Sequence, residues 1–527
     1  MGTLIYLVFY LAISTYSSDA YKALVVTQMP SQSHAILNSG IVKQLLKEGN
    51  EVTYVRSVEY KNAPATLRQV DVSSNEKALP ASAINIKALM DSSTLGRSHI
   101  RALQIMNHVA IKTLENENVQ KLLSDPKEYF DVAIIEFMDT DMLASFAAVF
   151  DCPLIWLSPI DVNSDILSRI DATPNPTYVV DAMSPNVTPL SFQQRINELL
   201  ARIKTYFLHY WYFEDMQIEA YNRLIAPLIK KRGREPPSFN DVRQNISLVL
   251  GYSHVSMGEA YSLPQNYKSV GGYHIDEDIK PLPENLKKVM DDAKDGVIYF
   301  SMGSNLKSSE WPTEIKQNLL KMLGGLKQTV LWKFEEQLPN PPKNLHISNW
   351  FPQLSILAHP NCVVFITHGG LLSTAEALHF GVPIIGIPAF GDQFVNINRA
   401  SRKGFGLKVD MTYNVVEDLK IALEEMTSNA LYRQKAKELS FIFHDRPMKP
   451  IEELSFWVRH VVETRGAPHL RSPGVDLPLY QQLYLDLVAI IILVLIIIFK
   501  LLKLIFSVIC PKKKWQSNKL DNKKKKK

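Results

Sequence analysis

Apolar residues along the chain form short continuous runs that alternate with stretches of helical periodicity. The first run, residues 23–27, is followed by a segment beginning near Ser33 in which apolar residues recur on one helical face. Residues 52–55 form the next run, and residues 131–135 and 153–157 continue the pattern. Short buried runs separated by amphipathic helices are typical of a parallel sheet built from βαβ units. The first half therefore predicts a doubly wound α/β domain.

The same pattern starts again in the second half of the chain. A segment rich in proline and charge follows Gly271-Gly272 and extends to Gly296, which indicates a connector between domains. Five strand-like runs follow it, at residues 297–301, 329–333, 345–348, 363–367 and 384–387. The sequence therefore predicts two doubly wound α/β domains, residues 21–270 and 271–475, that face each other across a cleft. Ligands are expected at the carboxyl ends of the strands.

The two ends of the chain have patterns of their own. Residues 4–13 are apolar and Ser18-Asp19-Ala20 is a small-x-small cleavage site, so residues 1–20 are predicted to be a signal peptide. A buried first strand is the alternative, and the better strand at 23–27 argues against it. Residues 485–509 are apolar enough for the roughly 20 residues that cross a bilayer, which predicts a transmembrane helix. An interfacial or core helix is the alternative there.

The charge of the chain is concentrated in its last residues. The full sequence carries +5, but the basic tail at 510–527 holds nine lysines and one aspartate, so the rest is negative. The basic balance is therefore no sign of a nucleic-acid partner. The tail should be cytosolic and the body lumenal, because positive charge flanks the cytosolic side of a span. Lys524 and Lys525 resemble a dilysine retrieval signal of the endoplasmic reticulum, although a lipid-facing basic run fits nearly as well.

Length and cysteine content restrict the class of protein. A chain of 527 residues predicts roughly two to four domains. Three cysteines are too few for a disulfide framework, and the sequence neither requires nor excludes a bridge between Cys152 and Cys362. In a lumenal body, Asn186 and Asn245 are the expected N-glycosylation acceptors, because each begins an Asn-x-Ser/Thr triplet.

Chemistry-bearing residues are densest between 349 and 400. A predicted strand leads into His368-Gly369-Gly370, and a helix follows. Glycines let the backbone approach a ligand closely, and the free N–H groups at a helix start suit an anionic diphosphate. A tight turn with a satisfied histidine is the alternative for these three residues taken alone.

Residues around this turn can hold the rest of a nucleotide sugar. Trp350 can stack on a base and Gln353 can hydrogen-bond it, while Glu376 lies where it could accept from ribose hydroxyls. Glu376 could instead form a capping box with Ser373. The pair Asp392-Gln393 combines a carboxylate with an amide, which suits vicinal sugar hydroxyls, and a solvated loop is the alternative.

This segment resembles the signature of the UDP-glycosyltransferase family, which has the GT-B fold. Residues 297–305 resemble the family's strand and loop beside the phosphates, and residues 465–467 with the span and tail resemble its animal, membrane-bound members, insect-type sequences most of all. The resemblance implies uracil contacts from Trp350 and Gln353, and a ribose contact from Glu376. It further implies diphosphate and sugar contacts from Ser304, His368, Gly370, Ser373, Asp392 and Gln393.

His34 is the candidate base. It follows the first predicted strand at the start of the first predicted helix, where the helix dipole disfavours an imidazolium and the ring should be neutral. Spacing alone favours a capping or satisfied histidine. In the family that this chain resembles, the matching histidine is the general base that takes the proton of the acceptor hydroxyl, with inversion at the anomeric carbon.

The carboxylate behind His34 is less clear in the sequence. The family has an aspartate directly after the strand at 131–135, where this chain has Glu136, with Asp139 and Asp141 a few residues on. We expect Asp141 by a narrow margin, with Glu136 as the rival; either could fix the tautomer of the imidazole. Asp139-Thr140-Asp141 also imitates the metal-binding motif of another glycosyltransferase class, but no ligand cluster completes it, and neither a metal nor a resident cofactor is expected.

The expected activity is inverting transfer of a hexose from a UDP-sugar to a hydroxyl of a small lipophilic acceptor, in detoxification or in hormone or pigment conjugation. Glucose is favoured as the sugar and glucuronic acid is left open. The acceptor pocket is expected around residues 137–150 and 159–211, and a homo-oligomer is left open. Two alternatives are a carrier protein without turnover, which Glu136 in place of aspartate motivates, and a UDP-sugar epimerase.

Overall fold

The computed structural model describes residues 20–79, 85–91, 98–171, 174–276, 278–336, 338 and 340–509. The chain divides into two units, a body up to Val475 and a C-terminal unit from Asp476 onward. The predicted signal peptide, apart from its last residue, and the predicted basic tail lie outside the described residues.

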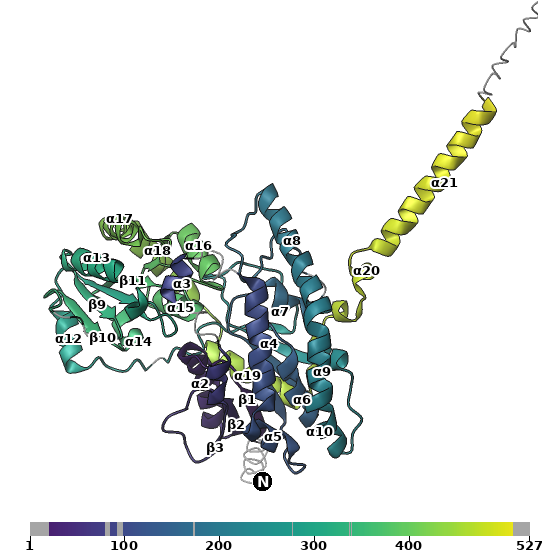
Figure 1. Ribbon diagram of the computed structural model, residues 1–527, viewed down its shortest axis with the longest axis horizontal. Coiled ribbons are helices and arrows are strands. Elements are labelled where there is room, and N and C mark those ends of the chain that lie inside the picture. Colours follow the sequence, from purple (N-terminus) through teal and green to yellow (C-terminus); the bar gives the residue numbers. More distant parts are fainter. Residues whose placement is uncertain are drawn as a thin grey trace, which may run out of the picture. The chain divides into compact units, whose positions relative to one another are not determined.

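The first half of the body is built on a seven-stranded sheet with the order β3-β2-β1-β4-β5-β6-β7, in which every pairing is parallel (Figure 1). Four of its strands confirm predicted runs to within one residue at each end. The strands β3, β6 and β7 were not predicted. The bounds are β1 Lys22–Val26, β2 Glu51–Arg56, β3 Leu67–Asp71, β4 Val132–Glu136, β5 Leu154–Ser158, β6 Ile246–Gly251 and β7 Tyr267–Ser269.

Helices cover both faces of this sheet because successive side chains of a strand point to opposite sides. Val25 of β1 packs in one core cluster with α2 and α19, and Leu24 packs in a second cluster with α4 and α5. The helices of the first half are α2 Gln32–Lys47, α3 Ile86–Asp91, α4 His99–Glu115, α5 Glu117–Ser124, α6 Ser145–Phe150, α7 Ser164–Ser168, α8 Phe192–Leu208, the π-helix η5 His209–Phe213, α9 Glu214–Leu224, α10 Ala226–Lys231 and α11 Phe239–Gln244, with short 3-10 turns η1 Ser73–Ala78 and η4 Met142–Ala144.

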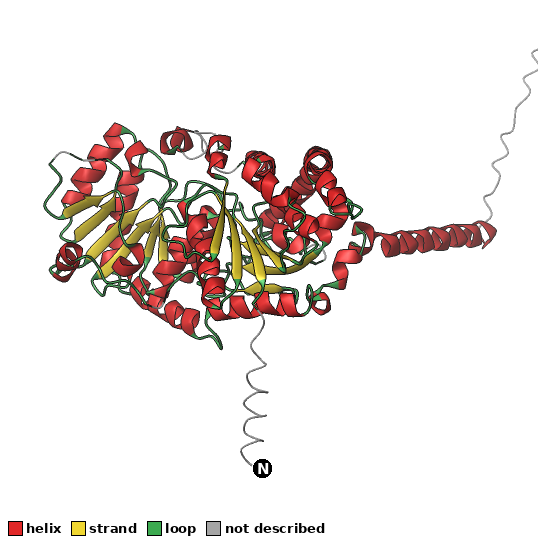
Figure 2. Cartoon of the chain, turned by 90° about the horizontal axis from the view of Figure 1, so that it is seen from below, coloured by secondary structure: helices red, strands yellow, loops and turns green. Residues whose placement is uncertain are grey.

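The second half is built on a six-stranded parallel sheet with the order β10-β9-β8-β11-β12-β13. Figure 2 shows its strands as a group separate from those of the first sheet, with helices on both sides. Three predicted strands have the predicted bounds, and β13 was not predicted. The strands are β8 Val297–Ser301, β9 Thr329–Lys333, β10 Leu345–Ser348, β11 Cys362–Thr367, β12 Ile384–Gly386 and β13 Gly406–Lys408.

The helices of the second half alternate with these strands. They are α12 Glu284–Asp291, α13 Thr313–Gly324, α14 Gln353–Leu357, α15 Leu371–His379, α16 Gln393–Lys403, α17 Val415–Ser428, α18 Leu431–His444 and α19 Pro450–Glu463, with 3-10 turns η6 Ser308–Glu310, η7 Pro468–Leu470 and η8 Pro473–Asp476. Both cysteines that the structure describes, Cys152 and Cys362, are free and buried.

Two helices pack against the half that lies on the other side of the connector in sequence. Ile86 and Leu89 of α3 lie in the core of the second half, beside Trp311 and Ile315. Leu454, Val458 and Val461 of α19 lie in the core cluster that holds α2 and the first sheet. The two halves are therefore interleaved, and the boundary expected near residue 270 separates the sheets rather than all the helices.

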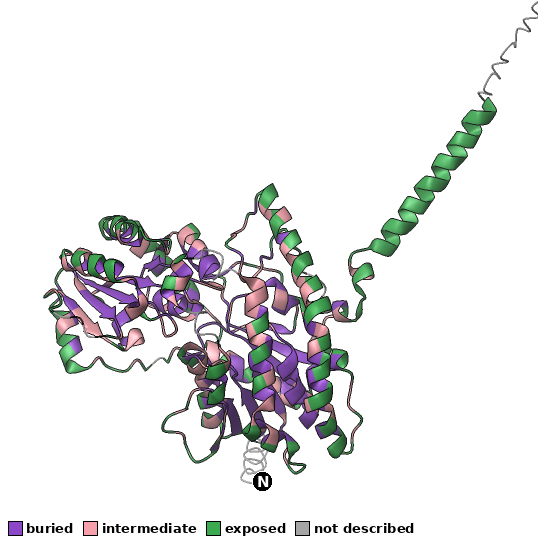
Figure 3. Ribbon diagram, viewed as in Figure 1, coloured by how far each residue is buried: buried purple, intermediate pink, exposed green. Residues whose placement is uncertain are grey.

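The C-terminal unit contains α20, Leu479–Gln482, and the long helix α21, Leu485–Ile509, whose bounds are those predicted for a transmembrane helix. Its mean hydropathy is 3.1 and it is exposed throughout (Figure 3). Among the described residues it is the one helix long and apolar enough to cross a membrane. It is a candidate membrane anchor.

Candidate active site

Each sheet has a switch point, where neighbouring strands lead to connections on opposite sides. It lies between β1 and β4 in the first sheet and between β8 and β11 in the second. Such points open a crevice at the carboxyl ends of the strands, where ligands bind in open α/β sheets. Of the predicted site residues, His34 follows β1, Glu136 ends β4, Ser304 follows β8 and His368 follows β11. Trp350 and Gln353 follow the neighbouring strand β10, and Asp392 and Gln393 follow β12.

At the first switch point, His34 and Glu136 form a close pair. His34 lies in the first turn of α2, and Glu136 is the last residue of β4. The Nδ1 atom of His34 lies 2.6 Å from Glu136 Oε1, and Asn38 Nδ2 lies 3.4 Å from the same oxygen. The Glu136 side chain is fully buried, whereas that of His34 is 18% exposed. An Nδ1–H that donates to Glu136 leaves Nε2 of His34 able to accept a proton.

Glu136 also determines the protonation of His34. Burial lowers the pKa of the His34 imidazole, but the charge and hydrogen bond of Glu136, with a further contribution from Asp392, outweigh burial and raise it. The prediction of a neutral ring considered only the helix dipole, and the contact with Glu136 shifts the pKa of His34 in the opposite direction. A carboxylate in direct contact has a stronger effect on the ring than the partial charge of a helix end.

Asp141, the favoured partner of His34, has a different contact, and that expectation is corrected. Asp141 lies at the start of η4, 3.4 Å from Arg169, which also lies 3.6 Å from Asp165. The loop after β4 turns through Asp139, whose φ is +49°, and carries Asp141 away from the strand end. Asp139 is half-buried, and burial with the charge of Asp165 raises the pKa of Asp139 to about 7. Glu136, the rival, is the partner that the structure shows.

At the second switch point, the His368 ring lies between two stretches of backbone. A Cβ added at Gly303 would lie 2.5 Å from His368 Cε1, and one added at Gly370 would lie 2.5 Å from His368 Nε2. Gly303 also has a φ of +81°, so glycine is required there on both counts. Burial, with the charge of Lys333, lowers the pKa of His368 to about 4. The ring is neutral near pH 7 and can act as a hydrogen-bond donor.

Lys333 is a cation of this region that the sequence analysis missed. It is the last residue of β9 and is 8% exposed. Its Nζ donates to the Gly303 carbonyl at 2.9 Å and lies 3.1 Å from a Glu335 carboxylate oxygen. The signal that could have found it is a lysine at the end of an otherwise apolar strand, where only a paired charge is stable.

Gln353 and Glu376, which are expected to bind the base and the ribose, belong to one hydrogen-bonded network. Gln353 Nε2 donates to Ser373 Oγ at 3.1 Å and to Glu376 Oε2 at 2.5 Å. The other Glu376 oxygen lies 3.0 Å from His274 Nε2, and His274 Nδ1 lies 2.9 Å from the Tyr252 hydroxyl. The structure thus brings together three predicted residues and two, His274 and Tyr252, that the sequence analysis missed.

Two details of this region bear on the capping box considered for Ser373 and Glu376 and on the stacking role expected of Trp350. The helix α15 begins at Leu371 with Gly370 as its N-cap, so the capping box of Ser373 with Glu376 does not form. The Trp350 side chain, in contrast, is 56% exposed, so a face of its ring is available for stacking. Ser304 lies in the loop after β8, beside Gly303.

The sugar-binding pair is placed at the start of α16. Asp392 is the N-cap, and its Oδ2 accepts from Asn396 Nδ2 at 2.8 Å. Burial raises the pKa of Asp392 and the charge of His34 opposes this effect, so the two groups act on each other across the halves. The Oε1 of Gln393 accepts from the backbone N–H groups of Ala389 and Phe390, so this end of the amide supports the loop.

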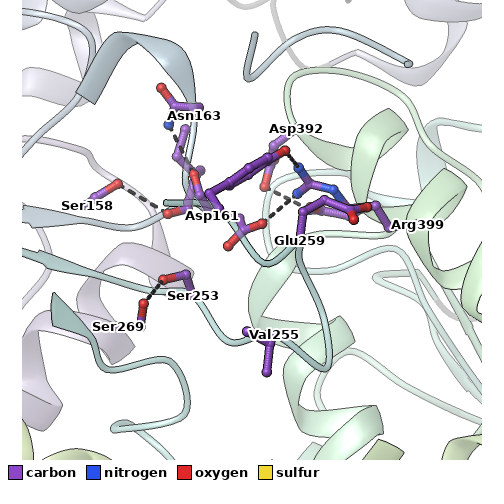
Figure 4. A network of polar contacts seen from close by, with 12 residues as sticks. Ser158, Asp161, Asn163, Ser253, Val255, Glu259, Ser269, Asp392 and Arg399 are labelled. Atoms are coloured by element: carbon purple, nitrogen blue, oxygen red, sulfur yellow. Dashed lines mark hydrogen bonds and ion pairs between the residues drawn. The ribbon is translucent and has the colours of Figure 1, made fainter. Parts of the chain in front are cut away.

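The same helix joins the two halves. Arg399 Nη1 donates to Asp161 Oδ2 at 2.6 Å, and the two side chains are 4% and 6% exposed. Figure 4 shows Arg399 directed at Asp161, with Asp392 in the same close view. Arg402 pairs with Glu259. A second link connects the loops, where Ser31 Oγ donates to Asn305 Oδ1 at 2.9 Å.

A cavity of about 830 Å³ lies beside this junction. Its lining residues come from the segment expected to bind the acceptor, from the connection between β6 and β7, and from α16. They are Thr177, Tyr178, Thr188, Pro189, Leu190, Arg195, Glu259 and Arg402. Among the residues that the structure describes, no group of three or more His, Cys, Asp or Glu side chains is arranged to hold a metal ion.

The two expected glycosylation sites differ in their surroundings. Asn186 Nδ2, the atom that would carry a glycan, donates to Glu198 Oε1 at 2.8 Å and is partly buried. Asn245 is exposed, and its contact, from Arg471 at 2.6 Å, involves only Oδ1. The structure therefore leaves the amide nitrogen of Asn245 more accessible than that of Asn186.

Two parallel sheets of this type, with polar sites at both switch points, define the GT-B class of glycosyltransferase. A solved UDP-glucosyltransferase from Polygonum tinctorium has the same fold, with a TM-score of 0.54 at 16% identity over 84% of this chain and 99% of that one. The calicheamicin glycosyltransferase CalG4 has a TM-score of 0.55 at 16% identity, with coverage of 84% and 99%.

The family follows from the sequence comparisons. Residues 22–516 match the family model described as "UDP-glucoronosyl and UDP-glucosyl transferase", and the chain belongs to this UDP-glycosyltransferase family. It is 32% identical to UDP-glucosyltransferase 2 of Dactylopius coccus, over 86% of this chain and 87% of that protein. It is 30% identical to human UDP-glucuronosyltransferase 2A3, over 73% of this chain and 69% of that one. The protein is therefore a glycosyltransferase that uses UDP-sugars.

Proposed function

We propose that the enzyme transfers glucose from UDP-glucose to a hydroxyl of a small lipophilic acceptor, with inversion. The observation that carries the mechanism is the 2.6 Å contact between His34 and Glu136 at the first switch point. In the proposed step, the acceptor hydroxyl gives its proton to Nε2 of His34 as its oxygen attacks the anomeric carbon. The bond from that carbon to the diphosphate breaks, and UDP leaves with the electron pair. Glu136 stabilises the imidazolium and positions the ring.

Residues of the second half would hold the leaving group. The free backbone N–H groups at the start of α15 would bind the diphosphate, and the neutral His368 would donate a hydrogen bond to it. Lys333 adds a positive charge behind the Gly303 loop. In this proposal, these groups stabilise the charge that develops on the diphosphate, and the transfer uses no resident cofactor or metal. Trp350 would stack on uracil, Gln353 and Glu376 would bind base and ribose, and Ser304, Gly370 and Ser373 would contact the phosphates.

Two observations support glucose over glucuronic acid as the sugar. A glucuronate carboxylate beside Asp392 would face a like charge, and the buried Arg399 nearby is already paired with Asp161. The insect relative at 32% identity is a UDP-glucosyltransferase. Asp392 and Gln393 would bind the hydroxyls of the sugar in this proposal.

The test is a donor competition with the full-length enzyme in membranes, using labelled UDP-glucose and UDP-glucuronate and a panel of phenols and lipophilic alcohols. We expect β-glucosides as the main products. Glucuronide formation as the main reaction would overturn the choice of donor. Bound UDP-sugar without transfer would point to a carrier protein, and a new UDP-sugar formed without acceptor would point to an epimerase.

We also propose that the body lies in the lumen of the endoplasmic reticulum, with the basic tail in the cytosol, where it would serve detoxification or the conjugation of hormones or pigments. The candidate anchor α21 and the charge of the residues after it support this orientation. Treatment of expressed protein with a glycosidase tests it. We expect a shift in mobility for the wild type that Asn245→Gln reduces more than Asn186→Gln does. A wild-type protein without any shift would contradict a lumenal body.

A further inference from the structure

Helix α16 packs against the backbone of the second half without free space. A Cβ added at Gly369 would lie 2.4 Å from Ile397 Cγ1, and one added at Gly386 would lie 2.1 Å from Ile397 Cδ1. The buried amide of Asn396 donates to the Gly369 carbonyl at 3.1 Å. Glycine at these two positions lets the helix approach closely. The helix is therefore fixed to the turn after β11, where the diphosphate site is proposed.

The last two turns of α16, in contrast, are held by the first half. Arg399 Nη1 donates to Asp161 Oδ2 at 2.6 Å, and Arg399 Nη2 donates to the Tyr261 hydroxyl at 3.2 Å. One turn further on, Lys403 Nζ donates to the Val255 carbonyl at 3.1 Å. The side chains of Arg399 and Asp161 are almost fully buried. These two charges have to stay together, because an unpaired charge is very unfavourable in a protein interior.

The position of the Asp161 carboxylate is fixed by the first half. A Cβ added at Gly258 would lie 2.2 Å from Asp161 Oδ2, so the backbone of the turn after β6 passes directly over the carboxylate. The Gly258 N–H donates to the His254 carbonyl at 2.8 Å and closes this turn. Figure 4 shows Arg399 reaching Asp161 from α16. The carboxylate is thus a fixed point of the first half, and its pair with Arg399 determines where this end of α16 lies.

The other end of α16 carries the residue that acts on the proposed base. Asp392 is seven residues before Arg399, which is two turns, so both lie on one side of the helix, about 10 Å apart along its axis. The charge of Asp392 contributes to the raised pKa of His34, and the charge of His34 acts on Asp392 in return. A rigid helix that is held at Arg399 therefore also fixes the place of Asp392 relative to His34.

We propose that Asp161 and Arg399 are a positioning pair, which sets the place of the sugar-binding Asp392 relative to the base His34. This inference rests on the proposed function, in which Asp392 binds the sugar and His34 takes the proton of the acceptor. The pair itself contacts neither substrate. It acts by holding the sugar, carried by the second half, in line with the acceptor hydroxyl, carried by the first half.

The first experiment compares two substitutions on the same helix in the full-length enzyme. Arg399→Met removes the charge and keeps the length of the side chain. We expect kcat to fall about 10- to 100-fold, since small displacements of reacting groups have effects of this size. UDP affinity, measured by calorimetry, should stay close to wild type. Lys403→Met is the matched control, because it also removes a cation that contacts the first half, and it should leave kcat almost unchanged.

The conservative variant Arg399→Lys should recover part of the lost kcat, because an ammonium group can still pair with Asp161. A double variant, Asp161→Asn with Arg399→Met, removes both charges, so no charge is left buried without a partner. We expect this double variant to fold and to bind UDP as the wild type does, and to keep the low kcat of Arg399→Met.

The pH profile separates positioning from general support of the fold. Two charges raise the pKa of His34, that of Glu136 from the first half and that of Asp392 from α16. Displacement of α16 weakens only the second, so the acidic limb of kcat/KM should move to lower pH in the double variant. A double variant with wild-type kcat and an unmoved limb would overturn the proposal, and so would a loss of UDP affinity as large as the loss of kcat.

The assay uses whichever UDP-sugar the wild type turns over. A glucuronide as the main product would thus overturn the proposed donor and leave the comparison of variants intact.

Discussion

The described residues of the body include two histidine–glutamate pairs, and the pairs differ in whether the imidazole keeps a nitrogen without a partner. Nδ1 of His34 lies 2.6 Å from Glu136, and its ring is partly exposed. His274 lies 3.0 Å from Glu376, but its second nitrogen contacts the Tyr252 hydroxyl and its side chain is 1% exposed. The first ring has a nitrogen left that could accept a proton, and the second has none. In the proposed mechanism, the same two residue types thus give the base in one place and a structural support of the donor site in the other.

We expect the largest effect on catalysis from a substitution of His34, the histidine whose second ring nitrogen is unused. His34→Ala should lower kcat by about 10²–10⁴-fold, because general base catalysis contributes about that much. UDP binding should remain close to wild type, since the proposed nucleotide contacts lie in the second half. Turnover is measured with a phenol acceptor, and UDP affinity by calorimetry. Wild-type turnover in this variant would remove His34 from the role of base.

Replacing the carboxylate behind that ring tests the pairing itself. Glu136→Gln should lower kcat by about 10–100-fold, as loss of a positioning partner does. Asp141→Asn is the matched control with the same change of charge to amide, and it should affect kcat less because Asp141 contacts Arg169. A larger loss in Asp141→Asn than in Glu136→Gln would favour Asp141 after all.

The second pair should affect binding rather than chemistry. Glu376→Gln weakens the contacts to His274 and Gln353 and removes the charge proposed to accept from ribose. A hydrogen bond to a charged group contributes about 1.5–3 kcal/mol, so the KM for UDP-sugar should rise about ten-fold or more. Steady-state kinetics with varied donor measure this change. A fall in kcat at unchanged KM would mean that this pair also takes part in the transfer step.

The smallest expected effect is a shift in pH dependence. In the proposed mechanism the neutral form of His34 is the active base, and Glu136 raises the pKa of this histidine above its ordinary value, so kcat/KM should fall as the pH drops through that raised pKa. Glu136→Gln removes the charge that raises this pKa, and the acidic limb should move to lower pH. Glu376→Gln should leave the limb in place. An unmoved limb in Glu136→Gln would show that another group titrates there.

The sequence predicted the strands and helix ends that depend on local pattern. The predicted bounds are correct for β8, β9, β10 and the helix α21. Continuous apolar segments of this kind can be recognised directly from the sequence. The strand β3, with the sequence LRQVD, has few apolar residues and was not recognised. In the site, the family resemblance implied that the loops after β8 and β11 both contact the phosphates, and the structure places Gly303 against the His368 ring.

The remaining features depend on contacts that no local pattern encodes. Glu136 and Asp141 are five residues apart, and the choice between them depends on where β4 ends and how the next loop turns. His274 lies 102 residues from Glu376, so nothing near either residue indicates their contact. The direction of the pKa shift of His34 is determined by its contact with Glu136 and not by its position in the helix.

The interleaving of α3 and α19 has a consequence for how the protein is made and recombined. By residue 445 every strand of both sheets has been synthesised, yet the core of the first sheet still lacks Leu454, Val458 and Val461. The first half can complete its core only after nearly the whole body has left the ribosome. For the same reason, a chimera of two family members joined at the connector would combine each sheet with a foreign helix. A junction that exchanges α3 and α19 together with the sheets they cover would keep both cores intact.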